Sequence, residues 1–127
     1  MKRKSPCSFV NHLWIDEVAR KDGTATLVMP FRDELTNPNG FVHGGAIASL
    51  ADATIALALV SLLGHGVFST AKMEIRFRSP TKGGTLVCES KIESNRGSFY
   101  FGKALVKEEG GKVVAEAQAT LSVPERK

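Results

Sequence analysis

Residues 46–63 read AIASLADATIALALVSLL, eighteen residues among which only Ser49, Asp52, Thr54 and Ser61 are polar. Alanine and leucine favour the α-helix, so this run predicts one long helix that is apolar on nearly all sides. Two glycines follow within three residues and predict its end. Such a helix needs an apolar environment, which either protein or lipid can provide.

The charge of Asp52 separates these two environments. A charged side chain at the centre of a bilayer costs about 2.5–3.5 kcal/mol, and no cluster of basic residues flanks the run. The sequence therefore favours a helix buried by protein, with no membrane partner.

Six runs of alternating polar and apolar residues surround the helix and predict β-strands. Two strands precede it, and an Asp-Gly turn joins them. Four strands follow it, and turns that contain glycine separate them. The predicted strands cover residues 13–20, 24–31, 67–78, 85–94, 98–107 and 113–123, with a loop at 32–41. Consecutive hairpins predict an antiparallel sheet, and small alanines on one face of the last strand let that sheet curl around the helix. We expect an α+β fold, a long central helix wrapped by a curved antiparallel sheet of about six strands.

Length and cysteine content limit the organisation of the chain. Its 127 residues predict a single domain, and residues 1–8 read as a flexible N-terminal segment. Cys7 and Cys88 lie far apart with no Cys-x-x-Cys or Cys/His cluster, which argues against a disulfide framework and against a metal site. This cysteine usage fits a reducing compartment, and no apolar segment typical of a secretory signal follows the basic start. We therefore expect a cytoplasmic protein.

The net charge of +4 indicates an anionic partner. Lysine and arginine are spread along the chain, and no nucleic-acid recognition motif is present, so nucleic acid is not the expected partner. A small polyphosphorylated ligand fits the charge equally well.

Asp52 is the first candidate for chemistry, because an ionised carboxylate inside an apolar helix must be hydrogen-bonded or face a cavity. A structural role, in which it caps a backbone group or pairs with a basic side chain, is the alternative. His43-Gly44-Gly45, directly before the helix, is the second candidate. Backbone N–H groups at a helix N-terminus suit a developing negative charge, although glycines also permit a tight helix entry and His43 can be a simple cap.

Gly44 and Asp52 are eight residues apart, which is about 12 Å along a helix axis. A single carbonyl group cannot touch both of them in one copy of the chain. If both groups act on it, one must come from another subunit, with two antiparallel helices related by a twofold axis. This geometry predicts at least a homodimer with two shared sites.

The segment from Asn37 to Asp52 resembles hotdog-fold acyl-CoA thioesterases of the phenylacetate-degradation type. Its pattern is Asn, two residues, Gly, two residues, His-Gly-Gly, and then an Asp seven residues after the second Gly. The resemblance continues through Arg78-Ser79-Pro80 and the Gly110-Gly111-Lys112 turn, and covers the chain from about Phe9 to Val123.

This resemblance implies hydrolysis of an acyl-CoA thioester, with Asp52 as general base or nucleophile and the Gly44 amide polarising the carbonyl. It further implies that Asn37 places the thioester or the water, that His43 holds the loop, and that Thr70 orients water or the carboxylate. The other residues expected to bind substrate are Gly45 and, for the phosphates of coenzyme A, Arg78, Lys82 and Arg96. No cofactor is implied, and the family leads us to expect a dimer or a dimer of dimers.

Two other functions remain open from the sequence. One is a hotdog dehydratase, whose catalytic spacing this chain does not resemble. The other is a non-catalytic acyl-CoA-binding or ligand-sensing domain, which would not need Asp52. The acyl group is also open, because Ala53, Ala56, Ala71 and Phe77 could line either an aryl or a medium-chain pocket.

Overall fold

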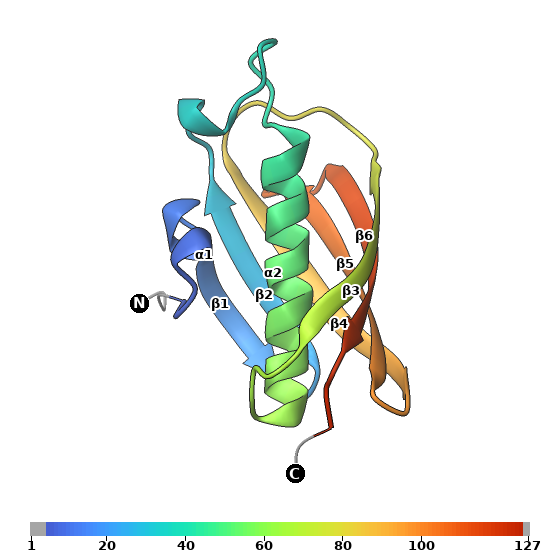
Figure 1. Cartoon of the computed structure of the whole chain (residues 1–127). Helices are drawn as coiled ribbons and strands as arrows, with labels where there is room; N and C mark the ends of the chain where they lie inside the picture. Colours follow the sequence, from blue (N-terminus) through green and yellow to red (C-terminus); the bar gives the residue numbers. More distant parts are fainter. Residues whose placement is uncertain (1–4, 126–127) are drawn as a thin grey trace.

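The computed structural model describes residues 5–125. One long helix, α2, lies across the concave face of a six-stranded antiparallel sheet whose strands are ordered β1-β2-β4-β5-β6-β3 (Figure 1). The strands are β1 (Asp16–Lys21), β2 (Thr24–Pro30), β3 (Ser69–Phe77), β4 (Thr85–Arg96), β5 (Phe99–Glu108) and β6 (Val113–Ser122). The helices are α1 (Ser8–His12), the 3-10 turn η1 (Asp33–Leu35) and α2 (Gly44–Leu63). The predicted α+β architecture is confirmed, and β1 and β3 form the two edges of the sheet.

Helix α2 begins at Gly44, two residues earlier than predicted, and His43 is its N-cap. It ends as predicted at Gly64, which has a φ of 81° and whose N–H donates to the Val60 carbonyl oxygen. Glycine adopts this left-handed conformation without a Cβ penalty. By length and composition alone α2 could cross a membrane; in this fold it packs on the sheet.

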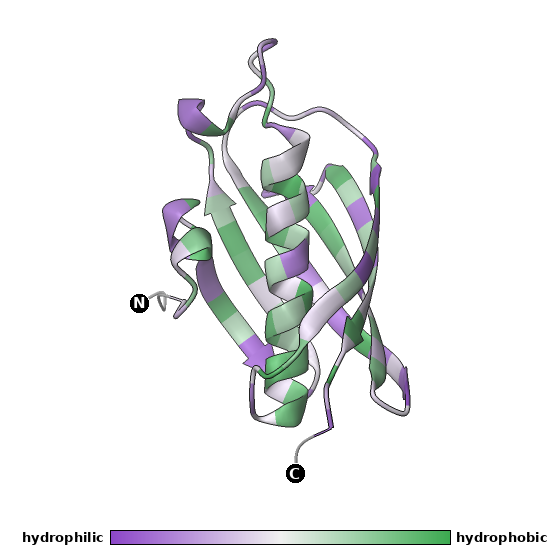
Figure 2. Cartoon of the chain, in the orientation of Figure 1, coloured by the Kyte–Doolittle hydropathy of each residue, from purple (hydrophilic) through white to green (hydrophobic). Residues whose placement is uncertain are grey.

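The core lies between α2 and the sheet. Fully buried side chains on the sheet-facing side of α2 include Leu50, Ile55 and Leu59. The predicted inward alanines of β6 are buried, and these small residues allow the sheet to curve closely around the helix. Hydrophobic colouring covers most of α2, with a hydrophilic band near its middle (Figure 2). Asp52 is the only charged residue of α2.

The N-terminal region differs from the prediction. The strand expected at residues 13–20 begins only at Asp16, because residues 8–12 form the short helix α1 and Trp14 turns the chain with a φ of 59°. The guanidinium of Arg32 lies over the Trp14 ring, 4.1 Å from its centroid, and supports this turn. The segment expected to be flexible covers residues 1–8, of which residues 1–4 lie outside the described residues. In the other half, Ser5 donates its N–H to the Asn11 side chain, and Ser8 begins α1.

The other strands begin and end within two residues of the predicted positions. Strand β1 contains a bulge between Glu17 and Ala19, and β3 contains one between Thr70 and Lys72. Neither bulge was expected from the sequence. Both lie on edge strands, where bulges are common and change the direction in which side chains point.

Candidate active site

Asp52 lies near the middle of α2 and is partly buried. Thr70, at the start of the edge strand β3, donates its hydroxyl to Asp52 Oδ1 at 2.7 Å. Among residues 5–125 no basic side chain lies within ion-pairing distance of this carboxylate. The alternative reading of Asp52, a charge locked in a structural ion pair, therefore finds no support in the described chain.

The face of α2 that carries Asp52 borders a cavity of about 770 Å³. Its floor comes from one stripe of the helix, at the three- and four-residue spacing of a single helical face. Its opposite wall comes from α1, β1 and β2. The helix contributes Ser49, Asp52, Ala53, Ala56, Leu57 and Val60, and the wall includes Phe9, Val10, Ile15, Glu17, Arg20 and Leu27. A mostly apolar cavity with a few polar groups is the usual form of a small-molecule site.

Two of the four residues expected to line an acyl pocket, Ala53 and Ala56, do border this cavity. The other two, Ala71 and Phe77, lie on β3 and do not. Phe77 instead lies beside Gly44: a Cβ added at Gly44 would be 3.2 Å from the Phe77 ring. The glycine thus permits close approach of β3 to the start of α2.

The two candidate amides at the N-terminus of α2 are the backbone N–H groups of Gly44 and Gly45, and they differ in whether they are hydrogen-bonded. His43 Nδ1 accepts a hydrogen bond from the Gly45 N–H at 2.8 Å, so His43 acts as the N-cap and Gly45 is engaged with it. Within the described chain the Gly44 N–H donates to no protein group. An open amide at a helix N-terminus, where the helix dipole is positive, can stabilise an oxyanion.

Asn37 shapes the loop that leads into α2. Its side-chain oxygen accepts hydrogen bonds from the backbone N–H groups of Asn39 and Phe41, at 2.9 and 3.2 Å. Gly40, with a φ of 84°, completes this turn. The Asn37 oxygen is thus occupied by its own loop, and only the amide nitrogen of the side chain remains for a ligand.

The candidate residues fall into two groups within one chain. Asn37, His43, Gly44 and Gly45 lie at the N-terminus of α2, and Asp52 and Thr70 lie two helical turns further on. Because α2 is continuous from Gly44 to Leu63, the axial separation of about 12 Å between Gly44 and Asp52 remains. The structure brings residues together inside each group, but one protomer does not bring the two groups together.

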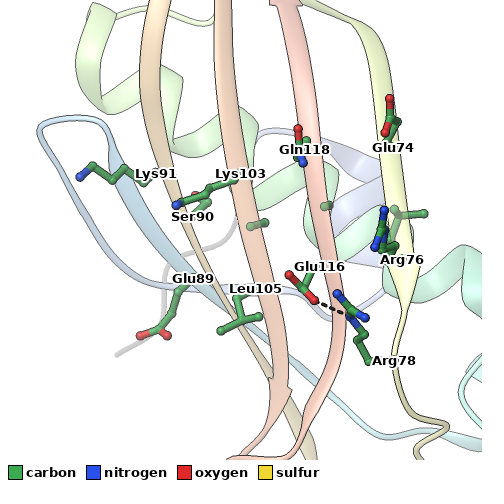
Figure 3. A pocket seen from close by; sticks show the side chains of 13 residues that line it. Glu74, Arg76, Arg78, Glu89, Ser90, Lys91, Lys103, Leu105, Glu116 and Gln118 are labelled. Atoms are coloured by element: carbon green, nitrogen blue, oxygen red, sulfur yellow. Dashed lines mark hydrogen bonds and ion pairs between the residues drawn. The ribbon is translucent and has the colours of Figure 1, made fainter.

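The three basic candidates are also dispersed. Lys82 lies near the start of α2, 5.1 Å from the centroid of the Phe41 ring. Arg96 ends β4, which pairs with the start of β5 at the other end of the sheet. Arg78 lies on the sheet face opposite α2, where it forms an ion pair with Glu116 (Figure 3).

Arg78 borders a hollow of about 840 Å³ on that outer sheet face. Its lining is dominated by charged side chains such as Glu74, Lys91 and Lys103 (Figure 3). This hollow is slightly larger than the cavity beside Asp52. However, none of the catalytic candidates lines it, and the sheet separates it from α2. We therefore place the candidate active site at the Asp52 cavity.

Sequence reasoning missed Glu17, Arg20 and Ser49 as cavity residues. Ser49 shares the helical face of Asp52, three residues away, so helical spacing alone could have indicated it. Regular strand alternation places Glu17 and Arg20 on opposite faces, and the sequence carries no signal for the bulge that changes this.

The helix and curved six-stranded sheet define the hotdog class of folds, and comparisons with known proteins place the chain in a family. Residues 39–115, more than half of the chain, match the sequence model of the thioesterase superfamily. The chain belongs to this superfamily.

Individual proteins are also similar to this chain. An acyl-coenzyme A thioesterase of Xenopus laevis is 37% identical over 68 residues, which are 53% of this chain and 30% of that protein. A conserved protein of Pseudomonas aeruginosa has 26% identity and a TM-score of 0.86, covering 91% of this chain and 93% of its own. The PaaI protein of the phenylacetic acid degradation operon of E. coli has 22% identity and a TM-score of 0.87, covering 94% and 86%; this likeness concerns the fold.

Proposed function

We propose that this protein hydrolyses an acyl-CoA thioester to a free acid and coenzyme A, with Asp52 as the general base or nucleophile. One observation carries the proposal: a carboxylate in the middle of an apolar helix accepts the Thr70 hydroxyl and faces an apolar cavity. As a base, Asp52 takes a proton from water while the water oxygen bonds to the acyl carbon. The carbon–sulfur bond then breaks, and Asp52 returns the proton to the departing thiolate sulfur, which restores the carboxylate.

The Gly44 amide stabilises the oxyanion that develops on the thioester carbonyl. Because about 12 Å of helix separates it from Asp52 in the same chain, the amide is supplied by a second protomer. The outer edge of β3 makes such a dimer accessible, since within residues 5–125 β3 pairs with β6 alone, on its inner side. Two β3 strands paired antiparallel would continue the sheet and set the two α2 helices side by side in opposite directions.

The remaining candidates act around this centre. Thr70 orients the Asp52 carboxylate through its hydroxyl. Asn37 and His43 hold the loop and the first helical turn beside the Gly44 N–H. Lys82 lies near that same helix end, where its ammonium can meet a phosphate of coenzyme A. Arg78 forms an ion pair with Glu116 on the opposite sheet face, so it is a weaker candidate than Lys82 for binding a phosphate of coenzyme A.

Replacement of Asp52 by asparagine tests the proposal. The amide oxygen can still accept the Thr70 hydroxyl, but the side chain can neither take a proton nor attack the acyl carbon. We expect kcat to fall by about 10²-fold or more. Release of free thiol from short, medium, long and aromatic acyl-CoAs is the measurement, and it also identifies the preferred acyl length.

Asp22→Asn is the matched control, because Asp22 lies in the β1–β2 turn, where its φ of 48° suits asparagine equally well. Near-normal turnover by Asp52→Asn would remove this carboxylate from the mechanism. If the wild-type protein bound acyl-CoA but released no thiol from any substrate of the series, a binding module would be the better description.

A further inference from the structure

The bulge in β1 places an ion pair inside the cavity that Asp52 borders. Residues three apart in a regular strand point to opposite faces. Here the register passes from Glu17 opposite Leu27 to Arg20 opposite Ala25, with one extra residue between them. Leu27 and Ala25 are both buried, and directly paired residues share a face. Glu17 and Arg20 therefore both face α2, and both line the cavity.

The pair has a fixed geometry. Arg20 donates from Nε to Glu17 Oε2 at 2.8 Å and from Nη2 to Glu17 Oε1 at 2.7 Å, which is the bidentate arrangement. The side chains are only 15% and 30% exposed, for Glu17 and Arg20 respectively. A guanidinium has five N–H donors, and the contact with Glu17 uses two of them. Donors thus remain available in a cavity that is otherwise mostly apolar.

The pair lies away from the reacting end of the cavity. The β1–β2 turn is fixed to the last turns of α2 by the Gly23 N–H, which donates to Ser61 Oγ at 2.8 Å. Arg20, just before that turn, therefore lies toward the Val60 end of the cavity. Val60 is eight residues after Asp52, which is about 12 Å along the helix axis. An acyl chain with its carbonyl at Asp52 would extend toward Arg20.

Inward-pointing charges and bulges also protect edge strands from pairing with other chains, and β1 is an edge strand. That role requires charges on the edge, but it does not require a hollow beside them. The cavity of about 770 Å³ that joins this pair to Asp52 is the additional observation. Arg20 N–H groups that border this cavity can donate to an oxygen of a ligand bound there.

We propose that the Glu17–Arg20 pair selects acyl groups whose far end carries an oxygen, either a hydroxyl or a carboxylate. This inference rests on the proposed thioester hydrolysis and names its substrate class. Arg20 donates to the ligand oxygen with an N–H that Glu17 does not use. An unsubstituted hydrocarbon end cannot accept this hydrogen bond from Arg20, so it is bound less well.

The test compares octanoyl-CoA, 8-hydroxyoctanoyl-CoA and the mono-CoA thioester of octanedioic acid. We expect the wild-type protein to favour at least one oxygenated substrate over octanoyl-CoA by about tenfold or more in kcat/KM. Arg20→Met should remove most of this preference. Because that variant leaves the Glu17 carboxylate without this guanidinium, the double variant Glu17→Gln/Arg20→Met is measured alongside it, with thermal unfolding of each.

Lys103→Met is the matched control. It breaks another ion pair, that of Lys103 Nζ with Glu93 at 3.0 Å, on the outer sheet face away from the cavity. The substrate preference should be the same in this variant as in the wild type. Calorimetric binding of free octanoate and free 8-hydroxyoctanoate, with wild type and Arg20→Met, measures the same preference without catalysis.

The outcomes separate the two proposals. If the protein hydrolyses all three substrates equally well, or if the double variant keeps the preference, the selection role is overturned while thioester hydrolysis stands. Unchanged selectivity together with self-association of the variants would assign the pair to edge protection alone. If no acyl-CoA is hydrolysed and the free acids bind equally, both proposals fail.

Discussion

Thr54, Cys88 and Ser90 form a small polar contact beneath the helical turn that carries Asp52. Ser90 donates its hydroxyl to the Thr54 carbonyl oxygen at 2.8 Å, and Thr54 donates its own hydroxyl to the Leu50 carbonyl oxygen at 2.6 Å. Both hydroxyl-bearing residues are buried, as is Cys88. The bond from Ser90 ties the middle of α2 to β4, two residues from Asp52, and so helps to fix the position of that carboxylate above the sheet.

Cys88 allows a test of this buried contact. Desolvation raises the pKa of its thiol to about 12, although a hydrogen bond with Thr54 acts in the opposite direction. Because only the thiolate is strongly nucleophilic, iodoacetamide at neutral pH should label the exposed Cys7 in the native protein and Cys88 only after unfolding. Mass spectrometry of the labelled peptides distinguishes the two; rapid labelling of native Cys88 would show that the contact between α2 and β4 opens.

The raised pKa also predicts a pH dependence of stability. Above pH 9.0, the ordinary value for this thiol, the unfolded chain loses the Cys88 proton while the native protein keeps it up to about pH 12. The unfolded state then binds fewer protons, so the free energy of unfolding falls with rising pH, by at most about 1.4 kcal/mol per pH unit from this group. Denaturant titrations of wild type and Cys88→Ala between pH 8 and pH 11 measure it, and equal slopes would contradict the burial of the thiol.

At the scale of elements, the distance between α2 and the sheet depends on Gly102 in β5. A Cβ at this position would lie 2.9 Å from Ile55 Cγ2 and 3.0 Å from Ile92 Cδ1, which is too close for either contact. We expect Gly102→Ala to cost about 1–3 kcal/mol of stability through overpacking. It should also lower activity, since Ile55 is one turn of helix from Asp52.

Gly110→Ala is the matched control, because a Cβ there would meet no atom within 4 Å. Unfolding in urea compares the two variants. Ile55→Ala and Gly102→Ala together should cost less stability than the sum of the two single changes, because the two residues share one contact. A fully additive double variant would mean that the helix does not approach β5 at this glycine.

The elements that the sequence predicted well are those with strong local signals. The alanine- and leucine-rich run predicted α2, and the glycine-containing turns predicted the hairpins to within two residues of their observed positions. Helix α1 was missed because five residues carry too little periodicity, and because its neighbour Trp14 adopts a φ that few residues other than glycine take. The bulge in β1 depends on tertiary contacts, so Glu17 and Arg20 could not be assigned to one face from their spacing.

The candidate site, too, could be predicted only where a local pattern carries the information. The positions of Asp52 and Gly44 on one helix follow from the sequence, as does their separation. The hydrogen bond from Thr70 to Asp52 requires β3 to pass beside the middle of α2, and the opposite placements of Lys82 and Arg96 require the sheet order. Such relations between distant segments are set by the packing of the whole domain, which local patterns do not encode.

At the scale of the whole molecule, the shared site predicts that two inactive variants can restore each other. Asp52→Asn removes the carboxylate, and Gly44→Pro removes the open amide. Proline suits this first helical position, and His43 before it has the extended ψ of 138° that proline requires of its neighbour. Loss of an oxyanion donor should cost about 10²- to 10³-fold in kcat. Gly44→Ala, which adds the same Cβ beside Phe77 but keeps the N–H, should lose much less.

When the Asp52→Asn and Gly44→Pro chains are refolded together, each mixed dimer contains one site with both changes and one site with neither. Random pairing makes half of the dimers mixed, so about one quarter of all sites should be intact. Thiol release should rise from the residual rate of either variant to about a quarter of the wild-type rate, and sedimentation of the mixture should show dimers or larger assemblies. If Gly44 and Asp52 of the same chain served one substrate, every site in every dimer would carry one of the changes. Mixing would then restore nothing, and the shared oxyanion site would have to be abandoned.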